Sequence, residues 1–530
     1  MSFRTLSIGC VVLITASAAS SAATITVSKG GAIPTIQGGV DAAGANDTVV
    51  VKAGTYNENV NVPTGKAGLT LKAKGKVVLD AHPAGGSAGN GPGIVIGSDD
   101  VSVTGFDIRN ASTDAGMTKD GDGISIAAIG VTITKCRIVN CLRSGVFTAA
   151  GGGLRVTSCS IAHCNLGLNL KSAGLRVTNT VIEDCDTGMK LDADGARIEK
   201  CTVRRTTAFA MDIDSDDCRI QKNVISNCDS GLGLTGLGGV VTRNTIAGIW
   251  NDAMSVANPN LVISRNRISD VDGHGIDLGG AGTTVTRNRI EHCNDDGIRV
   301  ATADSCTITR NDITGVLSSG VEAVSSNLAI IERNVIRFTE LQAIFVMGTA
   351  PAITNNRILD CSNGSPAIDL VSAGAGSITK NTLVGSGASG ILLRADTASV
   401  EVEQNDIRGA RDGIRAQGTQ QTVRDNKVRE CSGDGIFIDA ATASVTGNRV
   451  ERCVVDGIDV EGVISVTVSG NTVRDCGAEG IENNATGTSV TNNKATGNRI
   501  DFANDGAAST FTGNTSSDGT GNAPPPPEVD

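Results

Sequence analysis

The segment VTRNRIEHCNDDGIRV, residues 285–300, brings four reactive side chains together: His292, Cys293, Asp295 and Asp296. Histidine and cysteine are common zinc ligands, and a histidine beside carboxylates can transfer protons. Adjacent residues of an extended chain point to opposite faces, so His292 and Cys293 cannot bind the same metal. We therefore expect Cys293 in the core and His292 in a solvated turn, which leaves the two aspartates for chemistry.

Neighbouring segments carry further ionisable side chains at equivalent positions. Asp252, His274 and Asp296 each precede a short apolar strand of the form G-I-x-V, with A-M-x-V after Asp252 and G-I-x-L after His274. In extended strands the x positions face solvent, and two of them hold Asp277 and Arg299. A histidine between carboxylates suits acid–base chemistry on a glycosidic bond, and the acids suit Ca²⁺. This candidate catalytic site, the central cluster, comprises Asp252, His274, Asp277, Asp295, Asp296 and Arg299, with Ser255, Asp272 and Glu322 beside them.

A structural interpretation competes with catalysis at this cluster. Asp-Gly-Ile recurs at residues 122–124, 296–298, 412–414, 434–436 and 456–458. Aspartate is a common turn former, because its side chain bonds to nearby backbone groups. The recurrence favours these aspartates as turn residues of a repeat.

A second candidate catalytic site, the lysine cluster, lies nearer the N-terminus. Lys190, Asp192, Asp212 and Asp214 occupy outward positions of successive predicted strands, beside Asn169 and Lys171. A lysine can act as a base and the carboxylates can hold a cation. Alternating charge on neighbouring strands also stabilises a solvated face.

The elements that position both clusters are strands of one repeat. From residue 131 to 466 a unit of roughly 22 residues recurs, with three short alternating segments separated by Gly, Asn and Asp. The pattern predicts an all-β fold, a single parallel β-helix of about nineteen turns, each rising about 4.8 Å. Equivalent residues of successive turns then stack directly over one another.

Two further residue types repeat in register. Asparagine recurs at one position in fourteen units, and we expect a structural ladder in which it takes a left-handed corner conformation and bonds to stacked amides. Cysteine recurs at another position that elsewhere holds Val or Ile, so we expect free, inward thiols, although stacked pairs such as Cys141 and Cys164 lie near disulfide reach. The ladder asparagines are Asn223, Asn244, Asn266, Asn288, Asn311, Asn334, Asn356, Asn381, Asn405, Asn426, Asn448, Asn471, Asn493 and Asn514.

Composition sets the remaining expectations. Residues 1–23 have the order of a cleaved export signal. Residues 24–68 are expected to form the N-terminal cap, with a short helix at Pro34–Ala43, and the first strands; 69–515 form the coil and 516–530 a polar, proline-rich tail. The net charge of −11 argues against nucleic acid as a partner, and no later stretch is long enough to insert into a membrane. We expect an exported monomer, secreted or held in the periplasm or at the cell surface.

With these repeats, the chain resembles the right-handed parallel β-helix superfamily typified by pectate lyase. The opening ATITVSKGGAIPTIQGGVDAAGANDTVVVKAGTYNENVNV resembles the cap of NosD-type and related β-helix proteins. Gly273-His274-Gly275 and Asp295-Asp296 resemble polygalacturonase motifs, but their order is reversed and the later Arg-x-Lys motif has no counterpart. Uronate lyases of this fold use a basic residue and a cation, often Ca²⁺, which the lysine cluster could supply. The epimerase motif Asp-Pro-His is absent, and Ala81-His82-Pro83 only echoes it.

Three functions remain open. The first is binding of a polysaccharide, including an acidic one, at the outward face of one parallel sheet. The second is a lyase or glycoside hydrolase acting on uronate polymers through one of the clusters. The third is a non-catalytic structural or adhesive rod. Uniform repeats, with 2% aromatic residues and single Trp and Tyr residues, favour binding or structure over catalysis. The irregular segments 80–93 and 110–123 are expected to roof a groove leading to the lysine cluster.

Overall fold

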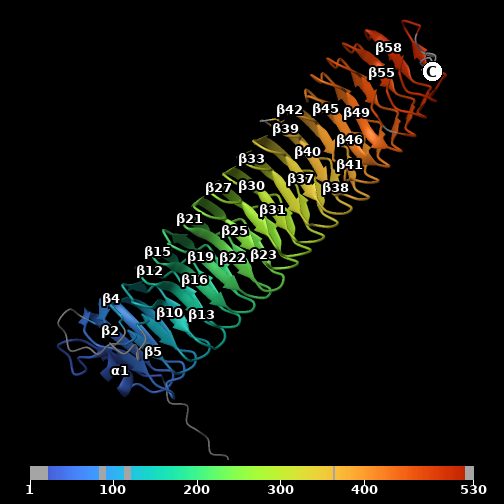
Figure 1. Ribbon diagram of the computed structural model, residues 1–530. Coiled ribbons are helices and arrows are strands. Elements are labelled where there is room, and N and C mark those ends of the chain that lie inside the picture. Colours follow the sequence, from blue (N-terminus) through green and yellow to red (C-terminus); the bar gives the residue numbers. More distant parts are fainter. Residues whose placement is uncertain (1–21, 83–90, 113–120, 362–363, 463, 520–530) are drawn as a thin grey trace, which may run out of the picture.

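The protein is a single rod of stacked strands, with α1 at one end and β58 (Ile500–Asn504) at the other (Figure 1). The computed structural model describes residues 22–82, 91–112, 121–361, 364–462 and 464–519. All strand pairs between successive turns are parallel in this part of the chain, apart from one isolated antiparallel bridge between Gly91 and Ser112. The predicted all-β solenoid is confirmed.

One turn of the coil contains three short strands. In the middle of the rod these are β29 (Thr284–Thr286), β30 (Arg289–Cys293) and β31 (Ile298–Ala301). Each pairs with its equivalent on the next turn, so that Ile290 lies opposite Ile313. Equivalent residues of successive repeats therefore stack over one another, as the sequence predicts.

The strands form two sheets. Sheet A is 40-stranded and contains the first and second strands of each turn, which pair from turn to turn as two ladders. Sheet B contains the third strand of each turn and carries both predicted clusters. Sheet B consists of β3 (Val60–Val62), β5 (Ile94–Ile96), β7 (Ile124–Ile126), β10 (Ser144–Thr148), β13 (Leu166–Leu170), β16 (Thr187–Asp192), β19 (Phe209–Asp214), β22 (Ser230–Thr235), β25 (Met254–Val256), β28 (Ile276–Leu278), β31, β34 (Val321–Val324), β37 (Ile344–Met347), β40 (Ile368–Val371), β43 (Ile391–Leu393), β46 (Ile414–Thr419), β49 (Ile436–Ala441), β52 (Ile458–Val460), β55 (Glu479–Asn483) and β58.

The described chain makes about 22 turns, slightly more than the predicted nineteen or so. The difference arises at the N-terminus, where β1 (Thr24–Val27), β2 (Thr48–Tyr56), β4 (Thr70–Asp80) and β6 (Ser102–Arg109) already pair in parallel as successive rungs. Their spacing is less regular than that of the later repeats, so the sequence pattern undercounts the turns at this end. The first strands expected beside the cap in residues 24–68 are β1, β2 and β3.

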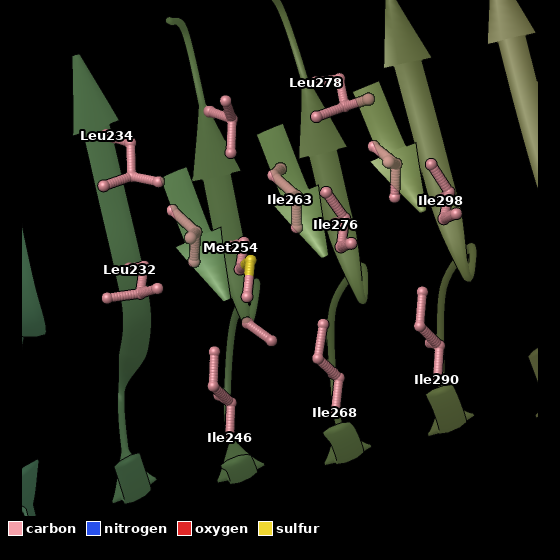
Figure 2. Packing of buried hydrophobic residues seen from close by; sticks show 14 of the residues in the cluster. Leu232, Leu234, Ile246, Met254, Ile263, Ile268, Ile276, Leu278, Ile290 and Ile298 are labelled. Carbon is pink, nitrogen blue, oxygen red and sulfur yellow. The ribbon is translucent and has the colours of Figure 1, made fainter. Parts of the chain in front are cut away.

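The core consists of like residues stacked in rows along the rod. Ile246, Ile268 and Ile290 are paired on successive turns, as are Ile276 and Ile298, and all are fully buried (Figure 2). The β-branched side chains have few rotamers and fit a pleated surface, which suits repeated stacking. Burying one such side chain contributes roughly 1.5–3 kcal/mol, and the same contribution recurs on every turn.

Helix α1 (Ile36–Ala42) packs against β1, β2 and β3 at the N-terminal end of the rod (Figure 1). Thr35 caps it, because its hydroxyl accepts the amide of Gly38 at 3.1 Å. Gly39 lies close to β1, and a Cβ there would be 2.4 Å from Cγ2 of Val27. The helix agrees with the predicted span to within a residue or two at each end.

The asparagine ladder is continuous from Asn223 to Asn514. Oδ1 of Asn288 accepts the backbone amide and Nδ2 of Asn266 at 2.9 and 3.0 Å, and its own Nδ2 donates to Asn311 and to the carbonyl of Ile263. The expected left-handed conformation is wrong for the asparagines themselves. The residue before each ladder asparagine has positive φ instead, as at Arg287 with φ 57°. The side chain thus acts through its hydrogen bonds alone.

All fourteen cysteines that the structure describes are buried and carry free thiols. Cys293 is fully buried. The side chain of His292 is 70% exposed, and the backbone of His292 is left-handed, with φ 53°. Inward thiols and a solvated His292 are therefore confirmed. Cys141 and Cys164, named above as within disulfide reach, are both free.

Several predicted segments lie outside the described residues. They include most of the expected export signal at 1–23, the end of the tail at 516–530, and the middle of both irregular segments, 83–90 and 113–120. Among the helices of the described chain, none has the length and apolarity needed to cross a membrane.

We predict that Asn288→Ala destabilises the protein by about 3 kcal/mol, because it leaves buried donors and acceptors of two neighbouring turns unpaired. The free energy of unfolding in denaturant titrations would measure this. The matched control is Asn294→Ala, whose exposed amide donates only to Asp272 and whose loss should change stability by less than about 0.5 kcal/mol. Equal losses in both variants would contradict a stabilising ladder.

Candidate functional site

Both predicted clusters contribute side chains to one outward row of sheet B. Inward and outward side chains alternate in each of its strands, and the strands stack in register, so one outward residue per turn joins the row. We call this row the outer column. From β7 to β55 it contains Ser125, Phe147, Asn169, Lys190, Asp212, Gly233, Ser255, Asp277, Arg299, Glu322, Phe345, Asp369, Leu392, Arg415, Phe437, Asp459 and Glu482.

In the central cluster, Arg299 lies between two carboxylates of the outer column. Its guanidinium is 3.7 Å from Oδ1 of Asp277 and 3.6 Å from Oε2 of Glu322. Burial raises the pKa of the Asp277 carboxyl above its usual range, and Arg299 opposes that shift. Burial, followed by the nearby Asp296 carboxylate, likewise raises the pKa of Glu322. Carboxyls that stay protonated above their usual range are suited to proton donation.

Asp252, His274 and Asp296 hold the backbone of successive turns. Oδ1 of Asp252 accepts the amide of His274 at 2.8 Å, and Oδ1 of Asp296 accepts the amide of Ser319 at 2.8 Å. Nδ1 of His274 accepts the amide of Asp296 at 3.2 Å and lies 3.4 Å from Oδ2 of the same residue. The same aspartate-to-amide bond joins Asp122 to the amide of Ser144 at 3.0 Å. The turn-forming role of these aspartates is therefore real.

Two predicted members are not joined to this cluster. Asp295 is exposed, and among the described contacts none links its side chain to Asp277 or Arg299. Asp272 is also exposed and accepts Nδ2 of Asn294 at 3.0 Å. The structure thus narrows the central cluster to the Asp252–His274–Asp296 row and the adjacent outer column.

The lysine cluster forms a shallow charged hollow. Nζ of Lys190 is 3.6 Å from Asp212, and Nζ of Lys171 is 3.3 Å from Asp192, while Asp214 lines the same hollow of about 240 Å³. The lysines are more than half exposed and paired with acids, as on an ordinary solvated face. The Asp212 and Asp277 rungs are three turns apart, roughly 14 Å at the strand spacing, so the two clusters are separate sites.

Sequence reasoning missed the phenylalanines of the outer column. Phe147, Phe345 and Phe437 are half-buried on its outward side, and guanidinium groups lie over two of the rings, Arg143 at 4.5 Å and Arg415 at 4.1 Å. The low aromatic content concealed them, because only Trp and Tyr were weighed as sugar-stacking residues. Their common place at the x position of the strand repeat was the available signal.

Sequence reasoning also missed an acidic group near the C-terminal end, where the recurrence of Asp-Gly-Ile favours turn residues. Carboxylate oxygens of Asp434, Asp456 and Asp459 lie within 4.8 Å of one another, and those of Asp456, Glu479 and Glu482 form a second such set. Burial raises the pKa of Asp456 to about 7 and that of Asp459 to about 8. The signal was D-G-I-D followed one turn later by E-G-I-E, with an acid at both outward positions of each repeat.

Raised carboxyl pKa values are confined to this face. In the described residues, each such carboxyl lies on sheet B or just before one of its strands, whereas arginine neighbours lower the pKa of Glu183 and Glu451 on sheet A. Perturbed pKa values cluster at functional sites. The shifted groups are Asp277, Glu322, Asp434, Asp456, Asp459 and Glu482.

The parallel strands, stacked turn upon turn, define a parallel β-helix protein. The right-handed β-helix family model matches residues 92–241, 230–375 and 366–516, so the chain belongs to the family described as "Right handed beta helix region". The predicted superfamily is thereby confirmed. The sequence matches none of the curated proteins with which it was compared.

Several solved structures are similar to this chain at a low level. A pectin methylesterase from carrot is 14% identical, covering 50% of this chain and 86% of its own, with a TM-score of 0.29. The pectate lyase Pel9A is 14% identical, covering 67% and 80%, with a TM-score of 0.27. A tailspike protein of E. coli bacteriophage HK620, in complex with a pentasaccharide, is 13% identical, covering 72% and 69%, with a TM-score of 0.37.

We predict that Asp459→Asn stabilises the cation-free protein at alkaline pH. The carboxyl has a raised pKa in the folded state, so its ionisation costs folding free energy as the pH rises from about 4 toward about 8. With divalent cations chelated, the variant should exceed the parent by at least about 1 kcal/mol at pH 9, and the difference should vanish near pH 4. Urea denaturation at both pH values measures it. A variant less stable than the parent at pH 9 would contradict the burial of this charge.

Proposed function

We propose that the protein binds a polysaccharide along the outer column of sheet B. The observation that carries the proposal is the composition of that column, in which carboxylates, arginines and phenylalanines follow one another at one-turn spacing over many turns. In a purely structural repeat such a column would be expected to repeat as the core rows do. The residue types change from turn to turn along the outer column, whereas the core rows keep similar apolar residues.

The chemistry of the column suits a sugar chain. Carboxylates accept hydrogen bonds from hydroxyl groups, arginine donates several in a fixed plane, and an aromatic ring packs against the apolar face of a pyranose. The turns rise by about 4.8 Å, close to the length of one pyranose residue in an extended chain. Successive sugars can therefore meet successive turns.

The order Asp277, Arg299, Glu322, Phe345 is the strongest candidate segment. Arg299 is held between two acids yet remains 39% exposed, and Phe345 follows Glu322 on the next turn. Arg299 can donate to a sugar hydroxyl or to a uronate carboxylate. A polysaccharide partner places the protein outside the cytoplasm in this proposal, in keeping with the expected export signal.

Cleavage of a uronate polymer is the second candidate, and one observation favours it. Asp277 and Glu322 are half-buried acids with raised pKa values on either side of Arg299, which is an arrangement able to donate and accept protons at a bound sugar. His274, at 17% exposure and bonded to the Asp296 amide, positions the turn beside them.

Binding is tested by affinity electrophoresis of the protein through gels containing neutral and uronate polysaccharides. We expect retardation by at least one polymer and a dissociation constant about tenfold weaker in Arg299→Ala, the equivalent of 1.4 kcal/mol. The matched control is Arg337→Ala on β36 (Val335–Thr339) of sheet A, where Arg337 is also paired with an acid, Asp312 at 3.1 Å. Loss of binding in the control would contradict binding along the outer column. No retardation by any polymer would leave a structural or adhesive rod as the function.

Cleavage is tested by incubating uronate polymers with the protein, with and without Ca²⁺, and following unsaturated products and reducing ends. If the central cluster is catalytic, Asp277→Asn should lower the rate at least a hundredfold while retardation in the gel persists. Lys190→Ala would lower it instead if the lysine cluster were the active site. Binding without any product would exclude turnover of the polymers tested.

A further inference from the structure

We propose that one Ca²⁺ ion binds between Asp434, Asp456 and Asp459, near the C-terminal end of sheet B. This site is distinct from the central and lysine clusters and does not depend on the proposed polysaccharide binding. Asp434 precedes β49, whereas Asp456 precedes β52 and Asp459 lies within it. The ion would therefore join two successive turns of the coil.

The three carboxylates converge on one point. Oxygen atoms from all three residues lie within 4.8 Å of one another. Calcium–oxygen distances of about 2.3–2.6 Å allow ligands on opposite sides of the ion to be up to about 5 Å apart. Three carboxylates, each binding through one or both oxygens, supply a large share of the six to eight ligands that calcium takes, and water can supply the others.

Existing hydrogen bonds orient two of the ligands. Oδ1 of Asp434 accepts the amide of Asp456 at 3.1 Å, and Oδ1 of Asp456 accepts the amide of Glu479 at 2.7 Å. Each bond fixes its carboxylate in the turn and leaves Oδ2 for another partner. The bonds that shape the turn thus preorganise the site.

Asp459 is the second, independent observation. It is only 6% exposed, and its Oδ1 is buried with no hydrogen-bond partner. Within the described chain no ion pair reaches Asp434, Asp456 or Asp459. A buried, unpartnered carboxylate beside two others is costly unless a cation compensates it.

The overlapping set Asp456, Glu479 and Glu482 is the weaker alternative. Glu479 is already engaged, because Oε1 accepts Nη2 of Arg499 at 2.6 Å. Magnesium also fits less well, since its ligand distances of about 2.0–2.1 Å span a smaller cage and it retains most of its water. The geometry therefore favours calcium in the first set.

The experiment uses the full chain after removal of divalent cations. Native mass spectrometry should show one bound Ca²⁺, and calorimetric unfolding should show a higher Tm with Ca²⁺ than with chelator. Asp459→Asn should bind Ca²⁺ at least tenfold more weakly and lose the Tm response. Asp434→Asn serves as a second variant if Asp459→Asn does not fold.

A matched variant locates the ion. Glu479→Gln should keep both responses, because its side chain belongs to the alternative set. Loss of binding in Glu479→Gln, retention in Asp459→Asn, no bound Ca²⁺ in the parent protein, or an equal response to Mg²⁺ would each overturn the proposal.

Discussion

The structure depends on one constraint, the vertical register of parallel strands from turn to turn. A parallel ladder alone does not set that register, because its hydrogen bonds recur evenly along the strand and a slip re-forms most of them. From Asn223 onward the buried asparagines do set it. Each must meet the asparagine of the next turn at about 3.0 Å, and a slip of one residue would bury its amide without a partner. The outer column exists only because this register is kept.

The fold could be predicted from the sequence because its causes are local and repeated. Alternation within each strand and the recurring Gly, Asn and Asp between strands specify one turn, and every other turn repeats it. The number of turns was underestimated at the N-terminal end, because the strands β1, β2, β4 and β6 are irregularly spaced in the sequence. The left-handed corner was assigned to the wrong residue for a different reason: an asparagine has two ways to serve a turn, and Asn288 uses its amide while Arg287 takes the strained φ.

The candidate site was predicted less completely, because function here resides in departures from the repeat. His274 was predicted to do acid–base chemistry between carboxylates, yet its ring accepts a backbone amide and belongs to the turn as much as to any chemistry. In the sequence, Asp456 and Asp459 resemble the aspartates of other repeats. They differ from those in that both carboxylates are buried and lie close together. How deeply an outward side chain is buried depends on the residues of neighbouring turns, so it cannot be predicted from the sequence of one repeat. The pairing of Arg299 with Glu322, by contrast, follows directly from register.

The asparagine ladder also gives the rod a direction. Every side-chain carbonyl from Asn223 onward receives hydrogen from the turn before it, and every Nδ2 gives hydrogen to the turn after it, so the amide dipoles all point the same way and add. At the first rung the acceptor is satisfied by the amide of Cys201, at 2.9 Å. At the last, Asn514 still donates to the carbonyl of Val490, but the hydrogen that each earlier rung passes forward has no asparagine to receive it in the described chain. The two ends of the ladder are thus electrostatic opposites: the first rung accepts from the turn before it, and the last carries a donor that no further asparagine of the described chain receives.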